Sequence, residues 1–192
     1  GEEETGYIDS DSEYFNLINI ARIKNITPKD EYNTDLYSDE IDYNLVEIIE
    51  AELKNYKSSF VLYDFTDMIE KFVSSELCPK FDVVFIDEAQ DLSPIQWKMY
   101  DIIKKNTKIM ILAGDDDQAI YGWAGADVKR FQDEPAKEKI LPQSYRVPIR
   151  VQKVADSIIS QIDTRINKIW NPRNEEGECK EVYDLDEVDL TQ

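Results

Sequence analysis

Two segments decide the fold of this chain: FDVVFIDEAQDL at residues 81–92 and KIMILAGDDDQAIYGWAGA at residues 108–126. Each contains a short apolar run, Val83–Ile86 in the first and Ile109–Leu112 in the second, and each run ends in carboxylates. Such runs, bounded by polar turns, are typical of strands buried on both faces of a parallel sheet. The helix-length spacer between them predicts a strand–helix–strand unit with a right-handed crossover.

Acidic side chains follow both predicted strands. Parallel sheets bind ligands beyond the carboxyl ends of their strands, where Asp87, Glu88 and Asp115–Asp117 are expected to lie. An acidic pair there can hold Mg²⁺ and orient a water molecule against a phosphate. The alternative for a single Asp-Glu pair is the N-cap of a helix. Two acidic strand ends, the second followed by a glutamine and two aromatic residues, favour the phosphate site.

Four segments resemble motifs of the UvrD/Rep-type superfamily 1 DNA helicases. DEAQD at 87–91 resembles their motif II, GDDDQAIYGWAGA at 114–126 their motif III, and LPQSYR at 141–146 their motif IV. DFTDMI at 64–69 resembles the element that leads from a helical insertion back into the first RecA-like domain. Two positions depart from the family pattern: Ser144 stands in place of the usual Asn, and Ala124 in place of the usual Arg.

The resemblance implies an α/β fold: part of a RecA-like P-loop NTPase parallel sheet with a helical insertion, from which the P-loop strand is absent. It divides the chain into three parts. Residues 1–60 are expected to form a helical insertion subdomain, residues 61–138 the C-terminal part of the first RecA-like domain, and residues 139–192 the start of the second.

The resemblance also assigns roles in ATP hydrolysis. Asp87 is expected to hold Mg²⁺, and Glu88, next to the metal, to act as general base on the attacking water. Gln118 is expected to bind the γ-phosphate and sense its loss, and Arg146 to reach ATP from the second domain as an arginine finger. For a single Arg after Tyr, a surface salt bridge is the alternative; Arg150 is a second candidate for a phosphate contact.

Tyr121 and Trp123 are the expected contacts for single-stranded DNA. Two aromatics around Gly122 cannot both be buried in a tight turn, so at least one is expected to face solvent. A base stacked on an aromatic side chain stabilises binding by about 1–3 kcal/mol whatever its sequence. The alternative is a tryptophan packed between domains.

Composition excludes several classes of site. The chain of 192 residues carries a net charge of −19 and has no histidine, which excludes histidine-based catalysis and histidine metal sites. Its two cysteines, Cys78 and Cys179, have no zinc-site spacing. The acidity argues against a broad DNA-binding face, although most basic residues follow Trp97. With no membrane span and no signal-peptide pattern, we expect a cytoplasmic or nucleoid-associated protein that is not secreted and does not contact a membrane.

No P-loop pattern is present, because none of the six glycines is followed by Lys. We therefore expect a helicase fragment that lacks the P-loop segment and the later helicase motifs, does not hydrolyse ATP alone, and self-associates through exposed apolar sheet edges. The alternative is a non-catalytic acidic module that binds proteins or mimics DNA. A nuclease-associated helicase subunit is a third hypothesis, but no nuclease carboxylate cluster with a Lys is present.

Local patterns predict the remaining elements. Helices are expected from Tyr14, from Thr27-Pro28 with Thr27 as N-cap, from Ile41, from Leu62, from Ser93-Pro94, from Val128 and from Pro148. The helix from Ile41 has one apolar stripe, made of Leu45, Ile48, Ile49, Leu53 and Tyr56. The helix from Leu62 is expected to turn Phe65, Met68, Ile69, Phe72 and Val73 inward, and the helix from Pro148 to turn Val151, Val154, Ala155, Ile158, Ile159 and Ile162 inward. A loop is expected at 31–40 and short strands at Ile140-Leu141 and 179–183, with a turn-rich break at 171–177 and a loose acidic segment at 1–10.

Overall fold

A computed structural model describes residues 12–34, 36–37 and 41–180 of the chain. The chain divides into two units, residues 1–133 and residues 134–192, and each is described by itself. The loose segment expected at 1–10 lies outside the described residues, as does most of the strand expected at 179–183; Cys179 and Lys180 belong to no regular element.

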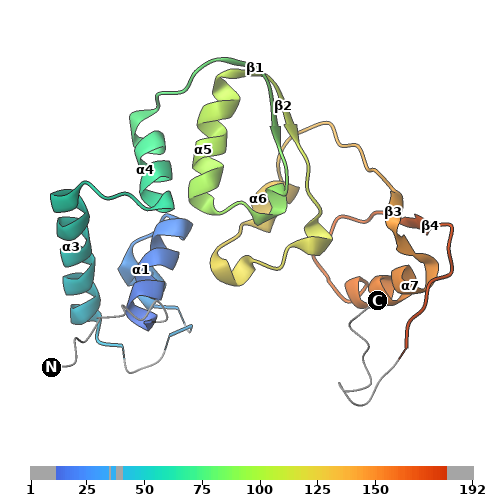
Figure 1. The fold of residues 1–192 in the computed structure, drawn as a ribbon, viewed down its shortest axis with the longest axis horizontal. Coiled ribbons are helices and arrows are strands. Elements are labelled where there is room, and N and C mark those ends of the chain that lie inside the picture. Colours follow the sequence, from blue (N-terminus) through green and yellow to red (C-terminus); the bar gives the residue numbers. More distant parts are fainter. Residues whose placement is uncertain (1–11, 35, 38–40, 181–192) are drawn as a thin grey trace, which may run out of the picture. The chain divides into compact units, whose positions relative to one another are not determined.

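The first unit begins with helices α1 (Glu13–Lys24), α2 (Pro28–Tyr32) and α3 (Tyr43–Phe60) (Figure 1). The helix start predicted at Thr27 is confirmed, and a capping box forms there: Thr27 Oγ1 accepts a hydrogen bond from Asp30 N–H at 3.1 Å, and Asp30 accepts from Thr27 N–H at 3.3 Å. The predicted loop at 31–40 is partly wrong, because α2 includes Glu31 and Tyr32. Lys24 Nζ binds Glu31 at 2.8 Å, which allows a completely buried carboxylate there.

Apolar residues from these helices form a small core around Leu17, Ile18, Ile41 and Val46, against which four tyrosines and Ile49 pack. In α3 only one residue is buried, Val46, whereas Leu45, Ile48 and Tyr56 of the expected stripe are exposed.

Helix α4 (Phe65–Ser75) is fixed to α1 and α3 by ion pairs. Arg22 binds Asp64 at 2.9 Å and Glu70 at 3.0 Å, and Lys57 binds Asp67 at 2.8 Å. The expectation that Phe65 and Met68 face inward is wrong: they are 83% and 50% exposed.

The predicted strand–helix–strand unit is present as β1 (Phe81–Ile86), α5 (Pro94–Lys105) and β2 (Thr107–Leu112), and the two strands pair in parallel with Phe85 opposite Ile111 and Ile86 opposite Leu112. Helix α5 begins at the predicted Ser93-Pro94, where Gln96 accepts a hydrogen bond from Ser93 N–H at 2.9 Å. Trp97 and Tyr100 of α5 are buried with Ile86, Met110 and Leu112 in a second core.

The expectation of strands buried on both faces is wrong for this pair. Side chains alternate along each strand, so one face carries the core residues and the other carries Phe81, Val83, Phe85, Ile109 and Ile111. These five residues, here called the open sheet face, are 38–73% exposed. In the described residues no helix covers them, because α5 packs on the opposite face.

The first unit ends with short 3₁₀ turns η1 (Ala89–Asp91), η2 (Asp116–Gln118) and η3 (Gly122–Ala124) and the predicted short helix α6 (Val128–Gln132).

The second unit contains β3 (Gln143–Pro148), α7 (Ile149–Ile159) and β4 (Asn171–Arg173), with β4 parallel to β3. The strand predicted at Ile140-Leu141 is wrong, and the break predicted at 171–177 contains β4. Helix α7 begins directly after Pro148, as predicted, but Val151, Val154 and Ile158 are exposed rather than inward. The chain is thus mixed α/β with two small parallel sheets.

Candidate functional site

Asp87 and Glu88 lie directly beyond the carboxyl end of β1. Asp87 Oδ1 accepts a hydrogen bond from Glu88 N–H at 3.0 Å. Glu88 adopts a left-handed conformation with φ 53° and ψ 41°, which is uncommon for a residue other than Gly. Glu88 is the N-cap residue of the short turn η1, but its side chain makes no capping hydrogen bond to that turn. Strained backbone of this kind is concentrated at functional sites.

The end of β2 lies beside the end of β1. Ala113 N–H donates to Ile86 O at 2.8 Å, and Ala89 N–H donates to Ala113 O at 2.9 Å, so backbone pairing continues past both strands. The structure therefore brings Asp87 and Glu88 to the same sheet edge as the loop that carries Gln118.

Asp115 organises this second loop. Its carboxylate accepts hydrogen bonds from Asp117 N–H at 3.2 Å and from Gln118 Nε2 at 2.7 Å. Gln132 of α6 donates to Asp116 Oδ2 at 3.0 Å. The expected phosphate sensor, Gln118, is exposed and its amide nitrogen bonds to the loop in which it lies.

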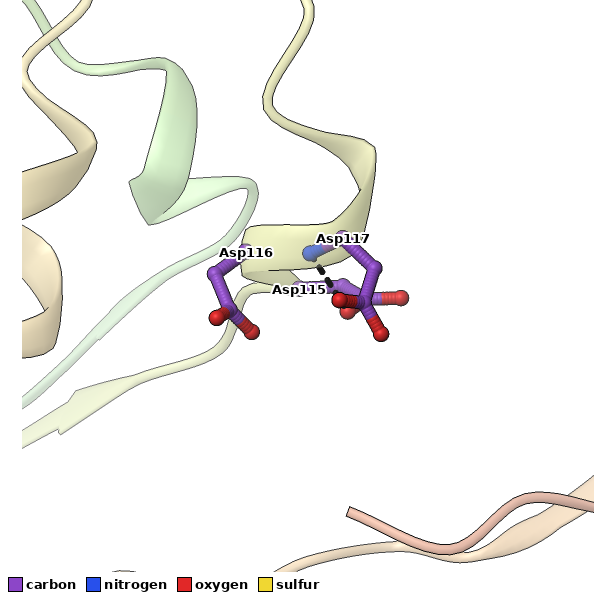
Figure 2. A group of neighbouring side chains, drawn as sticks. All are labelled: Asp115, Asp116 and Asp117. Carbon is purple, nitrogen blue, oxygen red and sulfur yellow. Dashed lines mark hydrogen bonds between the residues drawn. The ribbon is translucent and has the colours of Figure 1, made fainter. Parts of the chain in front are cut away.

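Asp115, Asp116 and Asp117 form an acidic group in which one carboxylate oxygen of each lies within 4.8 Å of the others. Figure 2 shows Asp115 and Asp117 side by side, joined by the hydrogen bond from the Asp117 backbone, with Asp116 projecting separately. In this structure Asp115 and Asp116 accept hydrogen bonds from protein amides within the loop and from α6.

Gln90 joins the two strand ends, a role that was not expected from the sequence. Its side chain is buried, with 1% of the residue exposed. Nε2 donates to Glu88 Oε2 at 2.8 Å and to Asp91 Oδ2 at 3.2 Å, while Oε1 accepts from Asp115 N–H at 3.0 Å. The available signal was its place in the turn between two predicted buried elements, where a polar side chain needs partners.

Gly114 permits this close approach. A Cβ added there would lie 2.7 Å from Gln90 Oε1, 2.9 Å from Phe131 Cζ and 3.2 Å from Ala89 N. No side chain larger than hydrogen fits without movement of these neighbours.

Tyr121 and Trp123 both face solvent, with 47% and 74% of their surfaces exposed. The expectation that at least one faces outward is confirmed. Their turn ends at Gly125, whose φ of 95° favours glycine. A Cβ at Gly125 would lie 3.2 Å from Lys24 Cγ and 3.3 Å from Ile23 Cγ2, so the turn packs against α1.

Arg146 lies on β3, in the second unit, which is described by itself. Its side chain is exposed and has no ion-pair partner among the described residues. Ser144 Oγ accepts hydrogen bonds from Arg146 N–H at 3.3 Å and Val147 N–H at 3.0 Å. Ser144 thus makes a local side-chain-to-backbone turn of a kind that Asn side chains can also make. Arg150 pairs with Glu176 at 3.5 Å, so it is a weaker candidate for a phosphate contact.

Asp87 fits the requirements of a Mg²⁺ ligand. It is exposed at the strand end, and among the described residues only its Oδ1 accepts a hydrogen bond. Mg²⁺ is usually held by one or two carboxylates together with water and substrate phosphates. Asp87, with Glu88 next to it, supplies that donor set.

The fold and site together define an α/β protein with an acidic site at the joined ends of two parallel strands. The family model of the UvrD/REP helicase N-terminal domain matches residues 5–139. The chain belongs to this family, as its motifs indicated.

Curated relatives are DNA helicases. The chain is 34% identical over 119 residues to DNA helicase II of Escherichia coli (57% of this chain, 16% of the relative). It is 31% identical over 159 residues to the ATP-dependent DNA helicase Rep of Buchnera aphidicola (68% of this chain, 24% of the relative). It is 32% identical over 111 residues to the ATP-dependent DNA helicase PcrA of Staphylococcus epidermidis (55% of this chain, 15% of the relative). The matches thus span a quarter or less of these relatives. In the described part of the chain, no helix has the length and hydropathy needed to cross a bilayer.

Proposed function

We propose that this chain is the middle part of an ATP-dependent helicase that couples ATP hydrolysis to movement along single-stranded DNA. The observation that carries the proposal is the joining of the two strand ends. Parallel pairing and the hydrogen bonds of Gln90 place the carboxylate of Glu88 and the loop of Gln118 at one sheet edge. Phosphate hydrolysis needs such a convergence, because the attacking water and the γ-phosphate must lie within contact of both groups.

In this proposal Asp87 holds Mg²⁺, which supplies positive charge to the phosphates when bound. Glu88 accepts a proton from the attacking water, and its fixed position relative to β1 orients that water. Gln118 donates its amide to the γ-phosphate in place of Asp115, which it binds in this structure. Arg146 stabilises the negative charge that develops on the transferred phosphoryl group.

Tyr121 and Trp123 are the proposed stacking surface for DNA bases. They lie only a few residues after Gln118, so a change in the sensor loop on loss of the γ-phosphate reaches them directly. Stacking tolerates every base, as movement along DNA requires.

We further propose that the chain alone does not hydrolyse ATP, because it has no Gly-Lys pair to wrap the phosphates. A reading frame that contains Gly-Lys-Thr or Gly-Lys-Ser upstream of Gly1 would support the helicase proposal. The second candidate, an acidic module that binds proteins or mimics DNA, is favoured by the net charge of −19 and the missing P-loop.

The experiment that separates the two is binding of a fluorescent single-stranded oligonucleotide, measured by anisotropy at fixed low salt. We expect Trp123→Ala to weaken binding by about 5- to 150-fold, the equivalent of 1–3 kcal/mol for one stacked base. Trp170→Ala, in the second unit, is the matched control and is expected to bind as the unmodified chain does. Absence of DNA binding, or equal binding by the Trp123 variant, would favour the acidic module.

ATP hydrolysis is measured in parallel, with and without the oligonucleotide and with Glu88→Gln as the control. We expect no turnover by the 192-residue chain. DNA-stimulated turnover that Glu88→Gln abolishes would refute the requirement for a P-loop and leave the roles at the strand ends intact.

A further inference from the structure

Gln90 makes a continuous hydrogen-bonded connection between the expected general base and the expected phosphate sensor. From Glu88 Oε2 the connection passes through the Gln90 amide to Asp115 N–H, at 2.8 Å and 3.0 Å. From Asp115 it continues through the carboxylate to Gln118 Nε2 at 2.7 Å. The two ends follow different strands, and the Gln90 side chain bonds to both.

The partners of Gln90 determine the orientation of its amide. An amide oxygen can only accept hydrogen bonds, and a carboxylate can also only accept them. Turning the amide round would place its oxygen against the carboxylates of Glu88 and Asp91 and leave Asp115 N–H facing an NH₂ group. The observed orientation is therefore the one that satisfies every group, and no other side chain of this size offers the same donor and acceptor pair.

Burial makes the connection stiff. Gln90 is 1% exposed, and a Cβ at Gly114 would lie only 2.7 Å from its Oε1, so the amide is closely surrounded on the side of its oxygen. A shift of the loop that carries Gln118 is consequently transmitted to Glu88.

We propose that Gln90 is a positioning residue that holds the carboxylate of Glu88 in register with the loop of Gln118, so that general base and phosphate sensor move as one unit. This inference rests on the proposed function for its consequence, namely that loss of the γ-phosphate at Gln118 withdraws Glu88 from its catalytic position. The connection itself is testable without nucleotide.

The test uses heteronuclear NMR on the full 192-residue chain. In the unmodified protein we expect a scalar coupling across the hydrogen bond between Asp115 nitrogen and the Gln90 side-chain carbonyl carbon. We also expect Glu88→Ala to shift the signals of the Asp115 amide and the Gln118 side-chain amide. In a Gln90→Met background that response is lost, and the Asp115 amide exchanges with solvent about three- to tenfold faster, the effect of one net hydrogen bond.

Two further variants make the result specific. Gln90→Glu keeps an acceptor for Asp115 N–H but has no donor for Glu88, so the Asp115 amide stays protected while the response to Glu88→Ala disappears. Gln132→Met is the matched control, because it removes a glutamine bond to the same loop at Asp116 without touching Glu88. We expect this variant to retain the response.

The inference is overturned if Gln118 responds to Glu88→Ala equally with and without the Gln90 amide, or if the Asp115 amide of the unmodified protein exchanges freely. Failure of the proposed function is a separate result, seen as loss of DNA binding in the anisotropy assay while the NMR connection persists.

Discussion

The close packing at Gly114 yields a prediction with a calculable size. In Gly114→Ala the new methyl group lies 2.7 Å from Gln90 Oε1, 2.9 Å from Phe131 Cζ and 3.2 Å from the backbone nitrogen of Ala89. All three contacts are shorter than van der Waals separation. The first two neighbours are buried or partly buried, and the third belongs to the backbone that pairs with β2, so none of them moves without cost.

Overpacking of this kind costs about 1–3 kcal/mol. The loss of glycine's freedom in the unfolded chain offsets about 0.4–1 kcal/mol, because the φ of Gly114 is one that alanine also adopts. The free energy of unfolding of the first unit is therefore expected to fall by about 0.5–2 kcal/mol. With a urea m-value of about 2 kcal/mol/M, the midpoint falls by about 0.3–1 M.

Urea unfolding followed by Trp97 fluorescence measures this, since Trp97 is buried in the core beside the site. Gly122→Ala is the matched control, because a Cβ at Gly122 meets nothing within 4 Å. We expect its free energy of unfolding to change by no more than about 0.5 kcal/mol, the range of neutral surface substitutions. Equal midpoints for the two variants would refute the packing argument.

Three further predictions follow from the same structure. Burial alone would raise the pKa of Asp64, but hydrogen bonds from Arg22 and Lys57 outweigh it and hold this pKa well below its usual value. The ion pairs therefore stabilise the protein fully above pH ~4 and lose their effect as the pH falls below it. Arg22→Leu is expected to cost about 1–3 kcal/mol at pH 7 and to flatten the dependence of the urea midpoint on pH between about pH 4 and pH 2. Val61 ends α3 with a left-handed backbone (φ 55°), which is unfavourable for a β-branched residue. Val61→Gly is therefore expected to raise the free energy of unfolding by about 0.5–1 kcal/mol, and an unchanged melting temperature would contradict this. The open sheet face is expected to drive self-association, and Phe85→Lys should reduce it, as measured by sedimentation. A monodisperse monomer of the unmodified chain would count against this prediction.

Local chemistry accounts for what the sequence predicted well. Helix starts at Thr27 and Ser93 depend on hydrogen bonds between residues three apart, so the residues themselves determine them. The parallel pairing of β1 and β2 follows from two apolar runs joined by one helix. These elements place the acidic strand ends, and the positions of Asp87, Glu88 and Gln118 could be predicted for that reason.

Exposure could not be predicted in the same way. Periodicity identifies which side chains share a face but not whether anything covers it, so Phe65, Met68 and the open sheet face were expected to be buried. Strand β3 was missed because its residues have no alternating pattern, and β4 because Asn171-Pro172 reads as a turn; their pairing is a long-range contact that no local pattern encodes. Gln90 was left without a role for a related reason, since its three partners come together only after the strands have paired.

The turn that carries Tyr121 and Trp123 shows how exposed aromatics are kept in place. Its last residue, Gly125, packs against Ile23 and Lys24 at the end of α1. Lys24 is itself fixed, because its amine pairs at 2.8 Å with the fully buried Glu31. The base of the turn is therefore held by the helical segment while its two rings face solvent, an arrangement that reduces the entropy lost when a base stacks. Gly125→Ala, with a strained φ and a methyl group against Lys24, should weaken oligonucleotide binding even though it removes no aromatic ring, and unchanged affinity would show that α1 does not support the turn.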